Sequence, residues 1–220
     1  MRKLPVDTVI FDFDSTILKG ELLEIIASSA LEQRSDREEV LAKLKEITNH
    51  GMEGSISFRD SLSQRLQLLD FGEAELAKAT RLAMSLINEQ YLGIVPMLQG
   101  KKVYVVSGGY KNVLDSMAEL MSVEKSHIFA IELFFERGQF SHFDGESLLV
   151  CPMGKAMVAN SIPNKGRTIM VGDGMTDYEV KQFGGAHHFA AYTGVVRRDA
   201  VCAKADFVIH DLHDLFEHIE

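Results

Sequence analysis

Two aspartates separated by one phenylalanine end an apolar run in "DTVIFDFDSTIL", residues 7–18. An ionised carboxylate is costly to bury without a partner, so Asp12 and Asp14 need a positive group nearby. Asp173 and Asp177 also follow an apolar run, in "RTIMVGDGMTD". Carboxylates gathered at one site repel each other, and a hard cation with oxygen ligands, such as Mg²⁺, relieves that repulsion. The four acids therefore predict a metal-assisted reaction.

Ser107, Gly108 and Gly109 close a second apolar run, "KKVYVVSGG", and Lys155 stands in "CPMGKAM" ahead of the Asp173 segment. Phosphoryl transfer needs a nucleophile, a proton donor, a divalent cation and groups that neutralise the phosphoryl oxygens. The residue types found here supply each of these parts. We therefore expect phosphoryl-transfer chemistry with Mg²⁺ as the cofactor.

Other interpretations of these motifs fit less well. In an EF-hand loop starting at Asp12, Ile17 would stand at the glycine position and Leu23 at the bidentate glutamate position. "GDGMTD" lacks the third glycine of a dinucleotide fingerprint, and Gly154-Lys155 lacks the spacing of a Walker motif. A single aspartate after a strand is more often a helix cap or turn residue. Four such pieces in order favour catalysis.

The elements that must position these residues alternate along the chain. Apolar runs at 7–14, 101–109, 167–174, 186–194 and 205–211 are typical of strands buried on both faces of a parallel sheet. Helical periodicity occurs at 111–122 and 212–219. We predict an α/β doubly wound fold, in which ligands bind beyond the carboxyl ends of the strands.

Two segments depart from the alternation. Residues 19–90 are mainly helical in pattern, which predicts a helical cap between two parts of the core, 1–18 and 91–220. Residues 128–143 contain two apolar runs separated by "ERGQ" and predict a β-hairpin.

Composition limits the classes of partner. The 220 residues carry a formal net charge of −9, which argues against a nucleic-acid surface. The sequence contains no run of about 18 apolar residues and no signal-peptide pattern, so we expect no membrane partner and a cytoplasmic protein. We expect a monomer or homodimer acting on a small molecule.

With these motifs in hand, the whole chain resembles phosphatases of the haloacid dehalogenase superfamily. The four motifs of that superfamily correspond to "DFDST", "VSGG", Lys155 and "GDGMTD". Within that superfamily, the chain most resembles the phosphoserine phosphatase family. The additional resemblance lies in Glu21, in "GMEGSISFRDSLSQRLQLL" (51–69) and in "HFDGE" before Lys155. The resemblance implies a Rossmann-like core with a helical cap inserted after the first motif.

The resemblance also implies catalytic roles. Asp12 would be the nucleophile that becomes an aspartyl-phosphate, and Asp14 would protonate the leaving oxygen and then activate water. Mg²⁺ would be held by Asp12, Asp173 and the backbone carbonyl of Asp14. The phosphoryl oxygens would be bound by Ser107, Gly108, Gly109 and Lys155. Asp177 would orient the loop and Lys155.

In the cap, the same resemblance implies that Glu21 accepts the substrate ammonium and that Arg65 clamps its carboxylate. Arg65 suits this task because its planar fork meets a carboxylate bidentately. Met52 and Phe58 would pack against the substrate, and Thr176 would contact it from the core.

The implied activity is Mg²⁺-dependent hydrolysis of O-phospho-L-serine to L-serine, as in serine biosynthesis. Two alternatives stay open. One is another phosphatase or phosphotransferase of this superfamily, for example one that transfers the phosphoryl group to homoserine. The other is a non-catalytic protein that binds a phosphorylated ligand, against which the intact acids and Lys155 argue.

Overall fold

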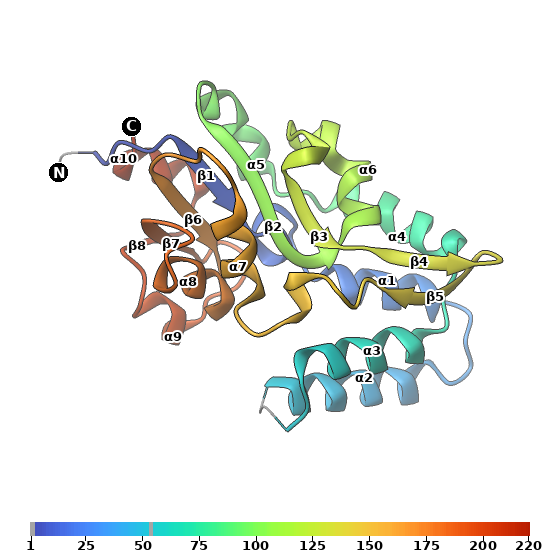
Figure 1. The fold of residues 1–220 in the computed structure, drawn as a ribbon. Coiled ribbons are helices and arrows are strands. Elements are labelled where there is room, and N and C mark those ends of the chain that lie inside the picture. Colours follow the sequence, from blue (N-terminus) through green and yellow to red (C-terminus); the bar gives the residue numbers. More distant parts are fainter. Residues whose placement is uncertain (1–2, 53–54) are drawn as a thin grey trace.

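The computed structural model describes residues 3–52 and 55–220, and a six-stranded parallel sheet forms its centre (Figure 1). The strand order is β3-β2-β1-β6-β7-β8. The strands are β1 (Thr8–Phe11), β2 (Lys102–Tyr110), β3 (Ile128–Ile131), β6 (Thr168–Gly172), β7 (His188–Tyr192) and β8 (Phe207–Ile209). All five predicted strand segments are confirmed, and β1 and β6 are buried along their whole length.

Strand β1 lies where the chain changes direction across the sheet. It pairs with β2 on one side and with β6 on the other, both in parallel. The chain therefore builds outward to β3 first and then returns to the other side of β1. In doubly wound folds the ligand crevice lies at the carboxyl ends of the strands at this switch point. The residues just after β1, β2 and β6 are the ones that can meet there.

Helices join these strands and pack on the sheet. They are α5 (Glu89–Ile94), α6 (Lys111–Met121), α7 (Gly154–Ser161), α8 (Met175–Gln182), α9 (Asp199–Cys202) and α10 (Leu215–His218). Short 3₁₀ turns occur at Val95–Leu98, Lys125–His127, Leu148–Val150 and Leu212–Asp214. Within the described stretches, no helix combines the length and apolar character needed to cross a membrane.

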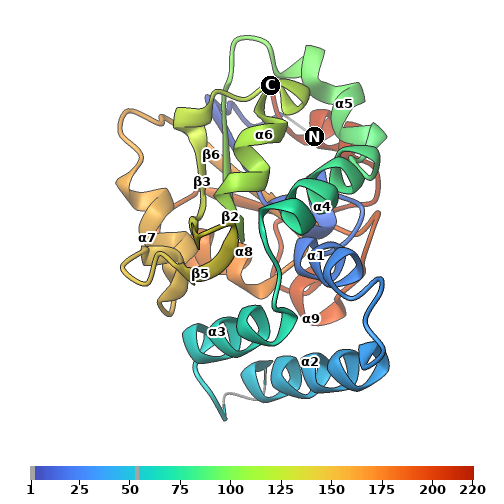
Figure 2. The same cartoon turned by 90° about the vertical axis from the view of Figure 1, so that its right-hand side faces the viewer.

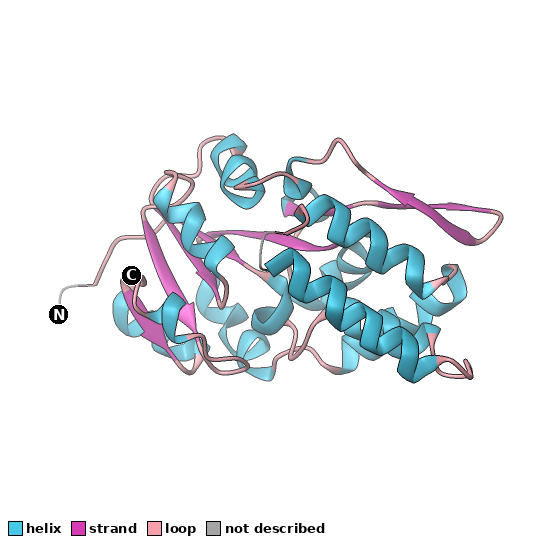
Figure 3. Cartoon of the chain, turned by 90° about the horizontal axis from the view of Figure 1, so that it is seen from below, coloured by secondary structure: helices cyan, strands magenta, loops and turns pink. Residues whose placement is uncertain are grey.

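The segment between β1 and β2 is helical, as its periodicity predicts. It contains α1 (Leu22–Ala30), α2 (Arg37–Met52), α3 (Phe58–Leu69) and α4 (Glu73–Ser85). Helices α2 and α3 lie side by side (Figures 1 and 3), and Figure 1 shows this pair set apart from the sheet. Helices α1 and α4 pack on each other, and α4 also contacts α6 of the core (Figure 2).

The two chain segments that connect these helices to the core run next to each other. Leu18 and Ile87 form an antiparallel bridge, and the Asn88 amide N–H donates to the Ile17 carbonyl at 2.8 Å. The side chain of Asn88, which is buried, donates to the Thr16 carbonyl and to the Tyr192 hydroxyl at 2.9 and 2.8 Å. The loop after β1 is thereby fastened to the core at its far end.

The predicted hairpin is shorter than the sequence suggested. Strands β4 (Leu133–Glu136) and β5 (Gln139–Phe143) form it, whereas residues 128–131 are the edge strand of the main sheet, paired with β2. The assignment of 128–131 to the hairpin was therefore wrong. Periodicity cannot separate the two strands, because "IFAIELFFE" is apolar on both sides of the break.

The hairpin contacts the helical segment through an aromatic cluster. Phe71, in the turn between α3 and α4, stacks on Phe140 with ring centroids 5.1 Å apart and meets Phe135 edge-on at 6.0 Å. A Cβ atom on the adjacent Gly72 would lie 2.4 Å from the Gly138 carbonyl oxygen. Only glycine allows this close approach of the two backbones.

Candidate active site

The loop after β1 brings two acids to the carboxyl end of the sheet. Phe13–Ile17 forms a kinked turn with non-helical backbone at Asp14 and Ser15, closed by the Leu18 amide N–H donating to the Phe13 carbonyl at 2.8 Å. Ser15 adopts a left-handed conformation, with φ of 52°. The turn begins with Asp12, whose Oδ1 accepts from the Phe13 amide N–H at 2.7 Å.

Asp14 is a half-buried acid held in one orientation. Its Oδ1 accepts from the Leu22 amide N–H at 2.8 Å, which satisfies one of the free donors at the start of α1. Burial raises its pKa well above the ordinary value, and the neighbouring Glu21 and Asp12 raise it further. Because Oδ1 already accepts a hydrogen bond, the proton belongs on Oδ2, which lies beside Gly109. Asp14 is thus prepared to act as an acid.

Lys155 is the cation that the buried acids require. Near the start of α7, its Nζ lies 2.8 Å from Asp12 Oδ1 and 2.8 Å from Asp177 Oδ1. Burial alone would lower the pKa of Lys155, but the two carboxylates outweigh that effect and raise it above its ordinary value. The ammonium therefore stays charged between the two carboxylates.

Asp177 supports this arrangement from the first turn of α8. Its Oδ2 accepts from the Gly174 amide N–H at 2.9 Å, so both of its oxygens are engaged. Burial and the nearby Asp12 raise its pKa to about 7. A Cβ atom on Gly172 would lie 2.2 Å from Asp177 Oδ2, so only glycine at position 172 leaves room for the Asp177 carboxylate.

Three carboxylates could hold a metal ion here. One oxygen from each of Asp12, Asp173 and Asp177 lies within 4.8 Å of the others, and all three residues are buried. Hard carboxylate oxygens are the donors that Mg²⁺ prefers. Because both Asp177 oxygens already accept hydrogen bonds, Asp12 and Asp173 suit a metal better. The site therefore fits a divalent cation.

Sequence reasoning missed Arg198. The Arg198 Nε donates to Asp173 Oδ2 at 2.9 Å. Burial and the nearby Asp12 raise the pKa of Asp173, and the Arg198 guanidinium acts to lower it. The only signal was its place in "GVVRRDA", shortly after the apolar run that forms β7. That signal is weak, because the adjacent Arg197 has the same sequence context but pairs with Asp199 in solvent.

The end of β2 faces the same point. Ser107 is fully buried, and its Oγ accepts from the Gly109 amide N–H at 2.9 Å. A Cβ atom on Gly109 would lie 3.2 Å from Ser107 Oγ and 3.5 Å from Asp14 Oδ2, so these two groups converge around Gly109. A Cβ atom on Gly108 would lie 3.8 Å from Phe58 Cζ, so this residue of α3 lies over the end of the strand.

The other residues expected to bind substrate differ in where they lie. Glu21 Oε1 accepts from the Ser15 hydroxyl at 2.8 Å, at the edge of the acidic loop. Arg65 is half-buried, and its Nε donates to the Ser61 carbonyl at 3.2 Å. Thr176 is exposed on the first turn of α8. Met52 ends α2, but its side chain lies outside the described part of the chain.

Electrostatics link Arg65 to the acidic loop. Burial lowers the pKa of Arg65, while Tyr110 and Glu21 act to raise it, so all three side chains share one neighbourhood. The structure therefore brings Glu21, Arg65 and Phe58 from the helical segment toward the core acids.

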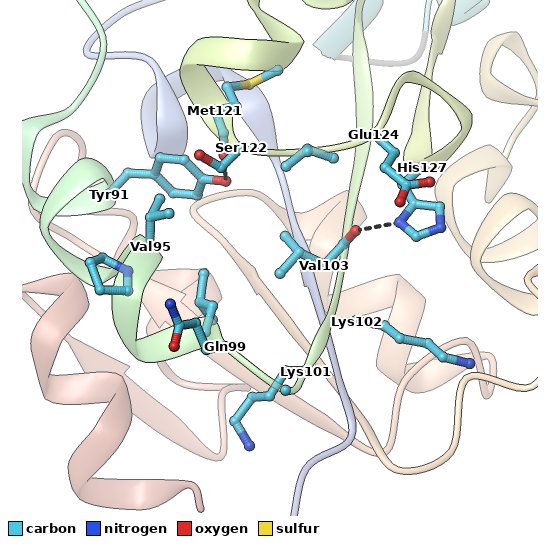
Figure 4. Close-up of a pocket in the computed structure, with 14 residues that line it drawn as sticks. Tyr91, Val95, Gln99, Lys101, Lys102, Val103, Met121, Ser122, Glu124 and His127 are labelled. Carbon is cyan, nitrogen blue, oxygen red and sulfur yellow. Dashed lines mark hydrogen bonds between the residues drawn. The ribbon is translucent and has the colours of Figure 1, made fainter.

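A cavity of about 560 Å³ lies elsewhere, at the opposite end of β2 (Figure 4). Its walls include Lys102 and Val103, which begin the strand that ends at the active site. Two of its polar side chains bond within the protein: the Tyr91 hydroxyl donates to the Met121 carbonyl at 2.9 Å, and His127 Nδ1 lies 3.1 Å from the Val103 carbonyl. This cavity holds none of the acids described above.

Fold and site together define a class of protein. A family profile of haloacid dehalogenase-like hydrolases matches residues 6–180, and the chain belongs to this family. The resemblance noted in the sequence is thereby confirmed.

Individual relatives carry a more specific name. The chloroplastic phosphoserine phosphatase of Arabidopsis thaliana is 29% identical over 98% of this chain and 72% of its own length. A phosphoserine phosphohydrolase-like protein from Francisella tularensis superposes with a TM-score of 0.84 at 29% identity, covering 97% of this chain and 100% of that one. A phospho-aspartyl intermediate analogue of phosphoserine phosphatase superposes with a TM-score of 0.73 at 27% identity, covering 99% and 100%.

Proposed function

We propose that this protein is a Mg²⁺-dependent phosphatase that hydrolyses O-phospho-L-serine to L-serine through an aspartyl-phosphate on Asp12. One observation carries the proposal: Lys155 Nζ lies 2.8 Å from the Asp12 carboxylate, next to a second acid, Asp14, whose pKa is raised. A nucleophile and a proton donor side by side are what covalent phosphoryl transfer requires.

In the first half-reaction, an Asp12 oxygen attacks phosphorus while the bond between phosphorus and the seryl oxygen breaks. The Oδ2 proton of Asp14 passes to that leaving oxygen, so serine departs as the neutral alcohol. Its raised pKa keeps Asp14 protonated for this step. Ser107, the backbone amide of Gly108 and the Lys155 ammonium bind the phosphoryl oxygens, with Gly109 beside them.

In the second half-reaction, Asp14, now ionised, takes a proton from a water molecule. The water oxygen attacks phosphorus, and the bond between phosphorus and Asp12 breaks, which releases inorganic phosphate. Both aspartates then return to their starting protonation states. Asp177 keeps Lys155 in place throughout, because its second oxygen is tied to the Gly174 amide.

The metal would be held by Asp12 and Asp173, with the backbone carbonyl of Asp14. When bound, Mg²⁺ neutralises negative charge on the phosphoryl oxygens. Arg198 orients Asp173 through the Nε to Oδ2 hydrogen bond.

We further propose that residues 19–90 form a cap that supplies specificity, while 1–18 and 91–220 supply the chemistry. The paired connections at Leu18 and Ile87 support this division. Glu21 would receive the substrate ammonium and Arg65 its carboxylate, with Phe58 packing nearby. Met52 and Thr176 remain proposed contacts. We also propose that the protein acts in the cytoplasm as a monomer or homodimer, without nucleic-acid or membrane partners.

The test is phosphate release from O-phosphoserine, O-phosphoethanolamine and p-nitrophenyl phosphate, with Mg²⁺ and after chelation. We expect phosphoserine to be the best substrate and chelation to abolish turnover. Asp12→Asn should remain folded, lose turnover and fail to become labelled from ³²P-phosphoserine, whereas the wild type is labelled. Turnover by Asp12→Asn like that of the wild type would refute the mechanism. Homoserine as an added acceptor distinguishes a phosphotransferase, since phosphohomoserine would then form.

A further inference from the structure

Ser15, the residue after Asp14, has an unusual backbone conformation for a buried residue. Its φ is 52° and its ψ is 13°, in the left-handed region that residues with a side chain rarely adopt. Six residues other than glycine in the described part of the chain have a positive φ, and Ser15 is 1% exposed. The other five are exposed; they are Asp70, Ser122, Arg137, Met153 and Asn164. Glycine adopts this conformation without steric cost, so a buried serine here indicates a use for its side chain.

The Ser15 hydroxyl holds the carboxylate of Glu21. Ser15 Oγ donates to Glu21 Oε1 at 2.8 Å. Glu21 is the N-cap residue of α1, yet among the described residues its side chain makes no capping hydrogen bond to that helix. The Asp14 carboxylate takes this part instead, by accepting from the Leu22 amide N–H. The orientation of the Glu21 carboxylate is therefore set by Ser15 and not by the helix that Glu21 begins.

Three hydrogen bonds thus join the loop after β1 to the start of α1. Asp14 is bound to the Leu22 amide, the Ser15 amide donates to the Gly20 carbonyl at 2.9 Å, and the Ser15 hydroxyl binds Glu21. An ammonium acceptor is in this way fixed beside the acid that protonates the leaving oxygen. In phosphoserine, the carbon that carries the ammonium is bonded to the carbon that carries the phosphate ester. A neighbouring acid and ammonium acceptor suit that arrangement of groups.

We propose that Ser15 is a positioning residue that fixes Glu21 for the substrate ammonium, and so creates a preference for phosphomonoesters with an amino group on the carbon next to the ester carbon. This proposal rests on the proposed function, because it takes Glu21 as the group that receives the ammonium. A carboxylate already held through one oxygen loses less rotamer freedom when it binds an ammonium. The left-handed backbone of Ser15 is the strain that this placement of the hydroxyl requires.

The test measures kcat/KM for three substrates in the wild type, in Ser15→Ala and in Ser15→Gly. Phosphoserine and phosphoethanolamine carry the ammonium, whereas 3-phosphooxypropanoate is phosphoserine without it. Both variants lack the hydroxyl. The values for the two ammonium substrates should therefore fall roughly 10- to 100-fold relative to the value for 3-phosphooxypropanoate, the range expected from loss of a hydrogen bond to a charged group.

Urea denaturation separates this loss from an effect on folding. Ser15→Gly should be more stable than Ser15→Ala, because glycine removes the strain of the left-handed backbone and alanine keeps it. The change in substrate preference should nevertheless be the same in both variants. Ser122→Gly is the matched control, because Ser122 is also a left-handed serine, with φ of 55°, and is exposed at the end of α6. It should leave all three kcat/KM values unchanged.

A double-variant cycle shows whether Ser15 acts through Glu21. Glu21→Ala removes the carboxylate and should abolish the preference for the ammonium substrates. Adding Ser15→Ala to Glu21→Ala should then leave the ratio of kcat/KM for phosphoserine to that for 3-phosphooxypropanoate where Glu21→Ala put it. A further fall as large as that in Ser15→Ala alone would show that the two residues act independently, and would overturn the proposal.

The remaining outcomes separate this proposal from the proposed function. A wild type that does not hydrolyse phosphoserine overturns both. A wild type that hydrolyses it, with Ser15 variants that keep the wild-type preference, overturns only the role of Ser15. Equal losses on all three substrates also overturn that role, because Ser15 would then support the loop as a whole. A loss of preference in Ser15→Ala that is absent in Ser15→Gly does the same, since it would follow backbone strain and not the hydroxyl.

Discussion

Replacement of Lys155 by methionine tests the electrostatic basis of the site. Methionine retains most of the aliphatic stem and removes the charge, so the packing changes little. The ammonium lies 2.8 Å from Asp12 and from Asp177, and the side chains of these three residues are 12%, 9% and 0% exposed. Without Lys155, two buried carboxylates lose their shared cation.

The magnitude follows from that burial. Removing one partner of a buried ion pair typically costs about 3–5 kcal/mol, because the other charge is left without compensation. We therefore expect Lys155→Met to lower the free energy of unfolding by about 3–5 kcal/mol at pH 8 in the presence of a chelator. Turnover should be lost as well, since the phosphoryl oxygens lose their ammonium.

The pH dependence has a definite sign. The Lys155 ammonium stays charged from pH 5 to 8, because its raised pKa lies above that range. In the wild type the pKa of Asp177 is about 7, above the ordinary 3.8, so stability falls as pH rises from about 3.8 to 7. Without Lys155 the pKa of Asp177 is higher still, so in the variant this fall continues above pH 7. The loss of stability relative to wild type is therefore smaller at pH 5 than at pH 8.

Urea denaturation followed by circular dichroism at pH 5, 7 and 8 measures these values. Lys165→Met is the matched control, because Lys165 donates to the Gly185 carbonyl at 2.8 Å and no carboxylate in the described part of the chain pairs with it. Its loss of stability should be the same at all three pH values. A deficit in Lys155→Met that does not change with pH, or no deficit, would refute the reasoning.

Three further predictions follow from other parts of the structure. Arg65→Ala should lower kcat/KM for phosphoserine roughly 30-fold to several thousand-fold, because removing one partner of a desolvated ion pair costs about 2–5 kcal/mol. The value for p-nitrophenyl phosphate should change much less. Arg81→Ala, at an exposed position on α4, is the control, and equal losses on both substrates would mean that Arg65 only maintains the cap. Mg²⁺ should raise the melting temperature more at pH 8 than at pH 5, because burial raises the pKa of Asp173 and protons compete with the metal; an equal shift at both pH values would argue against these ligands. Gly72→Ala should destabilise the protein by about 1–3 kcal/mol in urea denaturation, because its Cβ would meet the Gly138 carbonyl, whereas Gly145→Ala, with its nearest atom at 3.8 Å, should not.

The sequence by itself was enough to predict the sheet and the central acids. Continuous apolar runs this short that end in polar residues favour buried strands. The order of Asp12, Ser107, Lys155 and Asp173 along the chain matches the ends of β1 and β2, the start of α7 and the end of β6. Parallel strands bring their carboxyl ends to one edge, so residues far apart in sequence meet there without further information.

The tertiary structure decided what pattern and spacing leave open. Residues 128–131 join β2 rather than the hairpin because a strand's partner depends on long-range pairing, which a local apolar pattern does not specify. Arg198 carries no motif, and its importance depends on Asp173, which lies beside it only in the folded chain. The raised pKa of Asp14 likewise arises from burial and from Glu21 and Asp12 around it. Charge and proton affinity depend on solvent exclusion and neighbouring charges in three dimensions, and these exist only once the chain has folded.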